Sequence, residues 1–246
     1  MSSDPTIRQA PAAVAPALQL YLIRHGETEW SLSGKHTGRS DILLTQQGEN
    51  KARELGNYLR HISFAQILSS PLRRAVHTCT LAGMGQALQL EPDLAEWDYG
   101  QYEGLRSVDI LKLHPGWNIY RDGCPGGETP AQLAFRADRL LNRLLKQTGN
   151  IALFAHGQIG SVLAARWIGL ALEEAQHFML GTSSLGIFSF APHHPAVPVI
   201  ALWNAQPRVL FSSVTERPAN ARIAPAESSL ERWENEGGEI PQVQQT

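Results

Sequence analysis

Cysteine is scarce in this sequence, and it has neither a long apolar run nor a large excess of one charge. Its 246 residues include two cysteines, Cys79 and Cys124, which lie far apart and without a paired spacing. This pattern predicts two free thiols in a reducing compartment and argues against a disulfide framework. Because no apolar run approaches the length of a membrane span, we expect a cytoplasmic protein with no membrane partner.

The balance of charge gives a second exclusion. The chain has 21 Lys and Arg residues against 23 Asp and Glu residues, and its formal net charge is -2. A general nucleic-acid binder carries an excess of basic residues or a basic face, so the composition argues against a nucleic-acid partner. The sequence does not decide between a monomer and a homo-oligomer.

The sequence does hold enough apolar residues for one substantial core. Hydrophobic residues make up 43% of the chain, so no disulfide or metal is needed to stabilise it. Strand-like and helix-like segments alternate, which predicts one α/β domain over residues 18–205. The Ala- and Pro-rich residues 1–17 predict a flexible segment without the apolar core of a signal peptide. The polar residues 206–246 predict a partly ordered tail.

Apolar periodicity and capping residues place the elements of this domain. Continuous apolar runs predict strands at residues 18–23, 67–69, 88–90, 151–155, 185–190 and 199–203. Helices are expected to begin after Thr45, at Ser70 with Pro71 as the first helical residue, at the Thr129–Gln132 capping box, and near Ile159. Residues 102–124 are expected to form a loop.

Two of the predicted strands end in a histidine followed by a glycine. The two motifs are Arg24-His25-Gly26, after residues 18–23, and His156-Gly157, after residues 151–155. Open α/β folds bind ligands at the carboxyl edge of the sheet, so both imidazoles are candidates for a site there. A histidine considered alone is more often a packed or surface residue, and the pairing is what favours a site.

Further candidates come from two separate segments. Arg74 falls in the first turn of its predicted helix, where the helix N-terminus attracts anions, while its neighbour Arg73 is equally compatible with a surface charge. Glu96 lies in a loop with Trp97 and Tyr99, where burial would raise the pKa of its carboxyl group toward that of a useful acid. A loop carboxylate considered alone is more commonly exposed to water.

Together these residues describe a site for a dianion. Guanidinium groups match the oxygens of a phosphate in both geometry and charge, so a phosphate monoester is the natural ligand. One imidazole must then act as a nucleophile. His25 is the better candidate, because Gly26 permits a tight turn beside it and Arg24 can steady the transferred group.

These motifs resemble the signature segments of a known family. LIRHGET (22–28), SSPLRRA (69–75) and FAHG (154–157) are similar to those of the histidine phosphatase superfamily, in its phosphoglycerate mutase-like branch. The resemblance runs from about Leu18 to Asn204. It implies a phosphoglycerate mutase-like fold, a three-layer α/β/α sandwich with a mostly parallel central sheet.

The resemblance also implies a role for each candidate. The phosphohistidine nucleophile falls on His25 and the proton donor on Glu96. The phosphate pocket falls on Arg24, Arg74 and a cationic His156; Arg74 is preferred to Arg73 because it stands immediately before the alanine, as in the family motif. In the implied reaction His25 attacks phosphorus while Glu96 protonates the leaving oxygen, and water then hydrolyses the phosphohistidine.

Other segments sharpen the resemblance within the family. EWS (29–31), KHTGRSD (35–41), EWDYG (96–100) and WNIYRDGC (117–124) resemble the subgroup of the fungal sedoheptulose-1,7-bisphosphatase. This implies a metal-independent, cofactor-free phosphatase for a small phosphomonoester, such as a sugar phosphate or a sugar bisphosphate. The implied substrate-binding residues are Ser31, Thr37, Gly38 and Tyr99.

The chain departs from this subgroup after the second His-Gly pair. Gln158 and Ser161 stand where its members usually carry a histidine and an arginine. The missing cation should weaken the binding of a second phosphate.

Three alternatives remain at this stage. A mutase uses the same phosphohistidine, but the segment between Glu96 and His156 looks short for the capping insertions of such mutases. An inactive phosphate-binding module is disfavoured because all five expected residues are present. A metal hydrolase would have to draw on the other histidines, which lack ligand spacing. They include His61, His77, His114, His177, His193 and His194.

Overall fold

The computed structural model describes residues 17–206. The N-terminal segment and the C-terminal tail expected from the sequence therefore lie outside the described residues, apart from Ala17 and Gln206. Across residues 17–206, no helix reaches both the length and the apolar content that crossing a bilayer demands.

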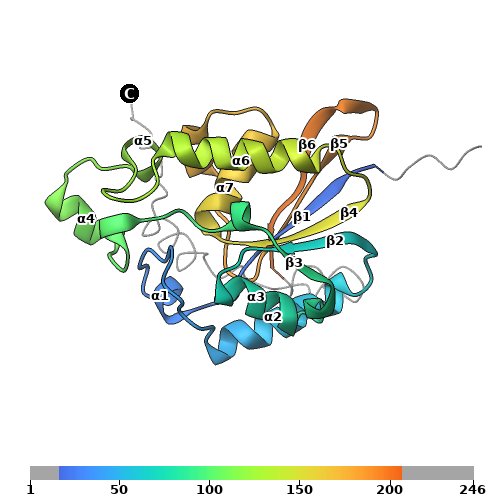
Figure 1. Ribbon diagram of the computed structural model, residues 1–246, viewed down its shortest axis with the longest axis horizontal. Coiled ribbons are helices and arrows are strands. Elements are labelled where there is room, and N and C mark those ends of the chain that lie inside the picture. The colour runs from blue at the N-terminus through green and yellow to red at the C-terminus, as the bar shows by residue number, and fades with distance from the viewer. Residues whose placement is uncertain (1–16, 207–246) are drawn as a thin grey trace, which may run out of the picture.

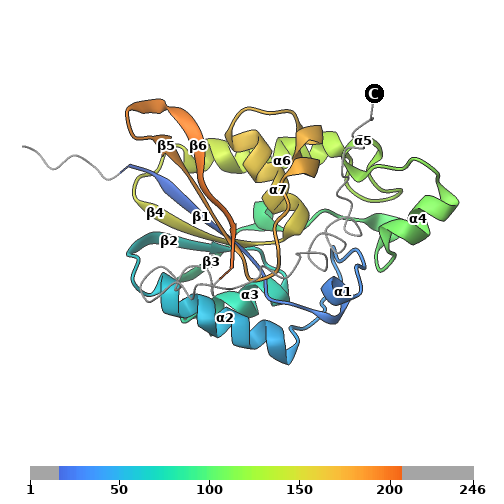
Figure 2. The same cartoon turned by 180° about the vertical axis from the view of Figure 1, so that it is seen from behind.

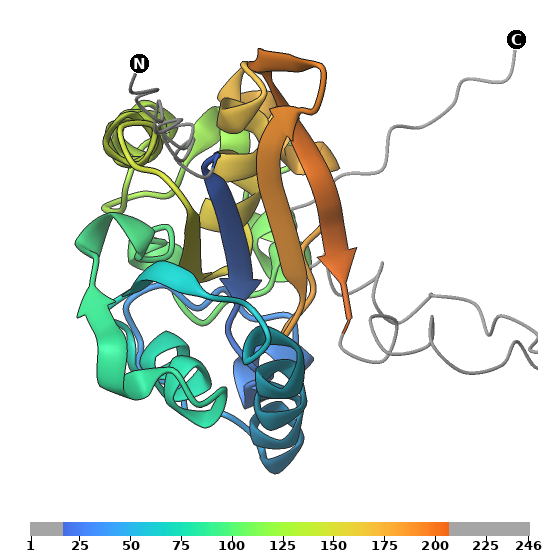
Figure 3. The ribbon, with the colours of Figure 1, turned by 90° about the vertical axis from the view of Figure 1, so that its right-hand side faces the viewer.

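A six-stranded sheet runs through the centre of the molecule, in the order β3-β2-β4-β1-β5-β6. The strands are β1 (Gln19–Arg24), β2 (Phe64–Ser69), β3 (Leu88–Leu90), β4 (Asn150–Ala155), β5 (Leu185–Ala191) and β6 (His194–Ala205). The first four are parallel to one another, and β5 and β6 complete the sheet as an antiparallel hairpin beside β1 (Figure 3). The sheet is thus mostly parallel, as predicted.

Helices cover both faces of this sheet. The α-helices are α1 (Glu29–Leu32), α2 (Gln46–Leu59), α3 (Arg73–Leu81), α4 (Ser107–Leu113), α5 (Ile119–Asp122), α6 (Pro130–Leu144) and α7 (Gly157–Trp167). Helices α2 and α3 lie on one face and α6 and α7 on the other (Figures 1 and 2). This arrangement confirms the predicted three-layer α/β/α sandwich. Short 3₁₀ helices occur at Gly85–Ala87, Pro92–Leu94, Gly100–Tyr102 and Leu172–His177.

Alternation along β1 sends its side chains into two separate cores. Leu20 and Leu22 pack in the cluster that includes the buried stripe of α6 and most of α7. Tyr21 and Ile23 belong to the cluster formed with α2 and α3. Each aliphatic side chain removed fully from water contributes roughly 1.5–3 kcal/mol. Because both faces are covered, the strand reads as one continuous apolar run.

Helix starts follow the capping residues in one case and not in another. The predicted capping box at Thr129 is present, with Pro130 as the first helical residue of α6. The predicted start of α3 at Ser70 is wrong, because α3 begins at Arg73 and its N-cap is Leu72. The hydroxyl of Ser70 does accept a hydrogen bond from the amide of Leu72, but this forms a bend ahead of the helix.

The segment between β3 and β4 is more ordered than the predicted loop over residues 102–124. It contains α4 and α5, which lie beyond the carboxyl ends of the strands, with α5 near the start of α6 (Figure 1). Trp117 and Tyr120 are buried in the core there, so these aromatic side chains are packed into the protein.

Candidate active site

Two neighbouring strands bring the histidines of the His-Gly motifs together. Parallel pairing sets Arg24 of β1 opposite Ala155 of β4, and the amide of His25 donates to the carbonyl of Ala155 at 3.0 Å. The two buried imidazole rings therefore lie side by side, with their centroids 5.1 Å apart. The site forms at the carboxyl edge of the parallel strands, as the sequence predicts.

The hydrogen bond of His25 fixes which ring nitrogen carries its proton. Nδ1 lies 2.7 Å from the carbonyl oxygen of Gly26, and a carbonyl can only accept, so Nδ1 must donate. Burial first, and then the charges of Arg74 and Arg24, lower the pKa of His25 well below 6.5. His25 is therefore a neutral imidazole whose lone pair is on Nε2. This is the form required of a nucleophile.

Gly26 lets the chain turn tightly after His25. A Cβ atom at this position would lie 2.8 Å from the carbonyl oxygen of Gly48 in α2. The amide of Gly26 donates to the hydroxyl of Thr78 at 2.8 Å, and this hydroxyl donates to the carbonyl of Arg74 at 2.7 Å. The turn that follows β1 is thereby joined to α3.

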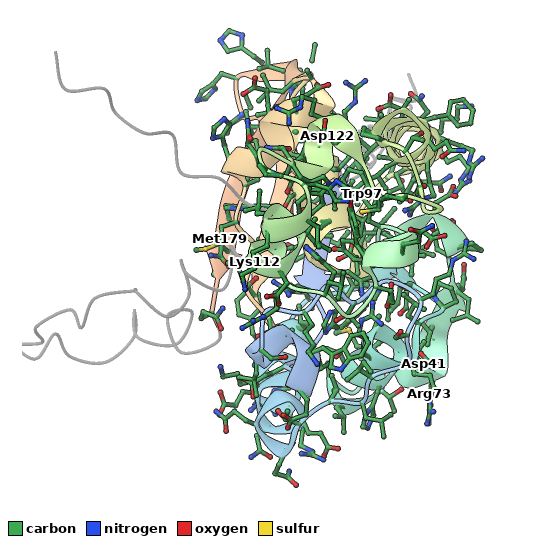
Figure 4. All side chains as sticks on the ribbon, turned by 90° about the vertical axis from the view of Figure 1, so that its left-hand side faces the viewer. Asp41, Arg73, Trp97, Lys112, Asp122 and Met179 are labelled. Carbon is green, nitrogen blue, oxygen red and sulfur yellow. The ribbon has the colours of Figure 1, made fainter. Side chains whose placement is uncertain are left out.

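Arg74 lies against the histidines, whereas Arg73 does not. The Arg74 side chain is buried, and its Nε donates to Nδ1 of His156 at 3.1 Å. Its terminal nitrogens donate to the carbonyls of Thr37, Gly38 and Ser40 at 2.8–2.9 Å. Arg73 is exposed and lies beside Asp41 at the periphery of the molecule (Figure 4). The choice of the arginine that precedes alanine agrees with this geometry.

The hydrogen bonds of His156 define its protonation in the ligand-free site. Because Nδ1 accepts from Arg74, the proton of the ring is on Nε2, which donates to the hydroxyl of Ser70 at 2.7 Å. Burial first, and then Arg74, His25 and Arg24, lower the pKa of His156 well below 6.5. In the ligand-free site the ring is therefore neutral, and the positive charge belongs to the arginines. The cationic His156 expected from the sequence concerns the site with phosphate bound, and it stays a prediction.

Arg24 reaches the same pocket from the end of β1. Its guanidinium donates to the carbonyl of Leu180 at 2.6 Å and packs against the first residue of α7, Gly157. A Cβ atom on Gly157 would lie 3.2 Å from the Cζ atom of Arg24. Glycine is thus what allows the guanidinium to lie against the start of the helix.

Glu96 enters the site from the segment that follows β3. One carboxylate oxygen accepts from the amides of Trp97 and Ile159, both at 2.9 Å, and the other accepts from the amide of Gln158 at 3.0 Å. Burial raises the pKa of Glu96, while the three amides and Arg74 act in the opposite direction; the net pKa is raised. The buried carboxyl is therefore inclined to hold a proton, as expected of an acid.

The predicted substrate-binding residues fall into two groups. Thr37 and Gly38 adjoin Arg74 through their carbonyls, and Gly38 packs against Tyr99 so closely that a Cβ atom would lie 3.0 Å from the ring. Ser31 is separate, because its hydroxyl serves in the capping box of α1 with Thr28. For residues 17–206, the hydrogen bonds of Ser31 join it to Thr28 and to none of the five catalytic candidates.

The structure adds residues that the sequence analysis did not assign to the site. Ser70 orients His156, a contact hidden in the SSPLRRA motif because its serine looked like a helix cap. The carboxylate of Glu103 accepts from the amides of Gly38 and Ser40, and no sequence spacing points to this long-range contact. His36 is buried against Tyr99, with ring centroids 4.6 Å apart, and burial lowers its pKa to about 3.

Gln158 and Ser161, the two residues that depart from the bisphosphatase subgroup, both form side-chain hydrogen bonds within the protein. The hydroxyl of Tyr120 donates to the side-chain carbonyl of Gln158. The hydroxyl of Ser161 contacts the carbonyls of Gly157 and Phe178 at 3.0 and 2.6 Å. Neither side chain carries charge into the site. Within the described chain, no three His, Cys, Asp or Glu side chains are grouped as ligands of a metal ion.

Comparison with known proteins agrees with this geometry. The family model of the histidine phosphatase superfamily (branch 1) matches residues 20–205. An acid phosphatase of Mycobacterium tuberculosis is 37% identical over 176 residues, which cover 70% of this chain and 86% of that protein. The sedoheptulose 1,7-bisphosphatase of Saccharomyces cerevisiae is 29% identical over 245 residues, which cover 74% of this chain and 90% of that protein.

Solved structures give the same result at the level of the fold. The product of an open reading frame of Mycobacterium tuberculosis superposes with a TM-score of 0.72 at 34% identity, and the match covers 77% of this chain and 98% of that one. The resemblance found in the sequence is therefore confirmed over most of its length. The protein is a phosphatase that belongs to the histidine phosphatase superfamily (branch 1).

Proposed function

We propose that the protein is a metal-independent phosphomonoester hydrolase that works through a phosphohistidine on His25. The observation that carries this proposal is the hydrogen bond from Nδ1 of His25 to the carbonyl of Gly26. It leaves the lone pair of Nε2 for attack and remains available to the imidazolium that forms when Nε2 takes the phosphoryl group. Arg24 and Arg74 supply two fixed positive charges beside it.

In the first step, Nε2 of His25 attacks phosphorus and forms the P–N bond as the P–O bond to the leaving alcohol breaks. Glu96 gives its proton to the departing oxygen, which leaves as a neutral alcohol. Arg24 and Arg74 stabilise the negative charge on the equatorial oxygens. The incoming dianion opposes the effect of the arginines on the pKa of His156, so this ring can take up a proton and bind the phosphoryl group as well.

In the second step, water attacks the phosphorus atom of the phosphohistidine from the side that the alcohol has left. Glu96, now a carboxylate, takes a proton from the water while the P–N bond breaks, and inorganic phosphate forms. Neutral His25 and protonated Glu96 are regenerated. The burial that raises the pKa of Glu96 supports this double use of one carboxyl group.

For the substrate, we propose a small phosphorylated metabolite of sugar size with one phosphate. A groove of about 470 Å³ borders Glu96, and Gly38, Arg39, Glu128 and Arg136 are among its other lining residues. None of His25, Arg24, Arg74 and His156 lines it, so we assign it to the leaving group and not to the phosphate. The neutral, hydrogen-bonded Gln158 and Ser161 argue against a strong preference for a bisphosphate. Initial rates on matched sugar monophosphates and bisphosphates test this choice; a large advantage for the bisphosphates would contradict it.

The experiment that tests the mechanism is a trap of the intermediate. Enzyme mixed with a ³²P-labelled monoester and quenched in alkali should carry label that acid releases, because phosphohistidine is acid-labile. His25→Ala should abolish both the label and turnover, with an unchanged circular dichroism spectrum. Label that persists in His25→Ala, or turnover within tenfold of wild type, would contradict the assignment. The assay is run with and without a strong chelator, and loss of turnover in chelator would contradict metal independence.

The same trap separates hydrolysis from mutase chemistry. A hydrolase releases the label as inorganic phosphate whether or not a phosphoglycerate acceptor is present. Transfer of most of the label to the acceptor would favour a mutase.

A further inference from the structure

Arg136, on helix α6, has all five of its N–H donors hydrogen-bonded to groups near Glu96. The Nε and one terminal nitrogen of Arg136 donate to the two carboxylate oxygens of Glu128, at 2.8 and 2.7 Å. The other terminal nitrogen donates to the carbonyls of Asp93 and Ala95, at 2.8 and 2.7 Å. A longer contact of 3.4 Å reaches the carbonyl of Glu96 itself. Five N–H groups thus meet five acceptors.

Burial makes this arrangement rigid. The side chains of Arg136 and Glu128 are 13% and 16% exposed, so the pair is largely shielded from water. A bidentate fork between guanidinium and carboxylate fixes the plane of the guanidinium. That plane in turn determines where the carbonyls of Asp93, Ala95 and Glu96 lie.

Main-chain groups also hold the chain on the C-terminal side of Glu96. The amide of Glu128 donates to the carbonyl of Asp98 at 2.9 Å, and the indole of Trp97 donates to the carbonyl of Glu128 at 2.7 Å. Trp97 lies centrally when the molecule is viewed from the carboxyl end of the sheet (Figure 4). A Cβ atom on Gly127 would lie 2.1 Å from the carbonyl oxygen of Asp98. Glu96 is therefore held on both of its flanks.

Two neighbouring arginines of α6 provide a contrast. Arg139 and Arg143 both bind the carboxylate of Asp93, and Arg143 also binds that of Glu91 at 2.6 Å. Their side chains are 50% and 48% exposed, and they hold the start of the segment through its side chains. Arg136 alone among these three holds the backbone on the N-terminal side of Glu96 together with the carbonyl of Glu96 itself.

We propose that Arg136, oriented by Glu128, is a positioning residue for the proton donor Glu96. By fixing the carbonyls of residues 93, 95 and 96, it sets the carboxyl group at the start of α7, where the amides of Gln158 and Ile159 receive it. The inference rests on the proposed role of Glu96 as general acid. Arg136 and Glu128 also line the groove proposed for the leaving group, and the charge of Arg136 acts on His156. Arg136→Lys keeps that charge, so the proposal predicts a defect mainly in the steps that need the acid, and the loss of any further effect when Glu96 is already replaced separates positioning from contact with the leaving group.

The test compares two leaving groups in the full-length enzyme. Glycerol phosphate needs a proton on its departing alkoxide, whereas p-nitrophenyl phosphate leaves without one. Arg136→Lys offers three donors from a single point and cannot reproduce the fork. It should lower kcat/KM for glycerol phosphate about 100-fold, the scale of a misplaced catalytic group, and for the aryl ester less than about fivefold. Glu128→Gln should shift the same ratio in the same direction, by less.

Two further variants separate this proposal from its premise. Arg139→Ala, the matched control on α6, should leave the ratio of the two substrates unchanged. Glu96→Gln should shift the ratio strongly, and adding Arg136→Lys to it should shift the ratio no further. Equal losses on both substrates in Arg136→Lys, with Glu96→Gln selective, would overturn the positioning role alone. If Glu96→Gln lowered kcat/KM equally for both substrates, the proposed role of Glu96 as general acid would itself be wrong. If Arg136→Lys does not fold, the ratio in Glu128→Gln decides.

Discussion

At the scale of the residue, the reactive centre depends on where single protons sit. His25 carries its proton on Nδ1 and His156 carries its proton on Nε2, although both rings are buried beside the same two guanidinium groups. The difference comes from their partners: a carbonyl that only accepts faces His25, and an Nε–H that only donates faces His156. Two chemically identical side chains therefore differ in what they can do: Nε2 of His25 keeps its lone pair for attack, whereas Nδ1 of His156 uses its lone pair to accept from Arg74.

The pH dependence of the reaction follows from two opposite pKa shifts. Turnover requires neutral His25, whose pKa is lowered by burial and the arginines, and protonated Glu96, whose pKa is raised by burial. The rate should therefore fall as pH rises through the pKa of Glu96 and fall again in strong acid as His25 protonates. With glycerol phosphate the wild type should show this alkaline fall in kcat/KM, whereas with p-nitrophenyl phosphate, which leaves without a proton, the profile should lack it. Profiles of the same shape for the two substrates would contradict this.

At the scale of the element, the site depends on the approach of the α7 N-terminus to the end of β1. Gly157→Ala places a Cβ atom 3.2 Å from the Arg24 guanidinium, which must then move by a few tenths of an ångström. Alanine favours a helix more than glycine does, so the unfolding midpoint should not fall. We expect the inhibition constant of inorganic phosphate to rise about tenfold. A lowered midpoint together with unchanged inhibition would contradict this explanation.

Elements with a long apolar signal were predictable, and short or exposed ones were not. The strands at residues 18–23 and 151–155 are confirmed because both faces of the sheet are covered, so each strand is apolar throughout. Helices α4 and α5 have seven and four residues, too few for a periodic pattern to show. Strand β6 begins at His194, earlier than expected, because its first residues are exposed and carry no apolar signal.

Some features of the site were likewise predictable from the sequence, and others were not. Motif positions placed His25, Arg74 and Glu96 correctly near one another, since each follows a strand that ends at the same edge. The charge of His156 in the ligand-free site was not predictable, because it depends on burial and on the orientation of Arg74. Arg136 gave no signal either, because a basic residue on an amphipathic helix ordinarily faces water.

At the scale of the whole molecule, three buried neutral histidines make stability depend on pH. Burial lowers the pKa values of His25, His36 and His156 from 6.5, that of His36 to about 3. Below about 6.5 the unfolded chain binds protons that the folded protein excludes, so the free energy of unfolding falls as pH falls. Each ring contributes about 1.4 kcal/mol per pH unit within its window, and nothing above 6.5.

The contribution of one ring can be isolated. His36→Gln keeps a polar group near Ser107, which bonds the imidazole at 3.2 Å, and removes one titrating site. Urea unfolding across the acid range should show a slope of free energy against pH smaller by about 1.4 kcal/mol per unit than in wild type. Identical slopes would mean that His36 is protonated in the folded state as readily as in the unfolded chain.

The pairing of β1 with β4 also bears on how this enzyme comes into being. Its first and second imidazoles belong to opposite halves of the sequence, and the register that joins Gln19 to Asn150 and Arg24 to Ala155 is what makes them neighbours. Closing so long a stretch of chain is entropically expensive and slow compared with forming any single helix. During biosynthesis, catalytic competence must therefore await emergence of β4 from the ribosome, however early β1 and its helices are made.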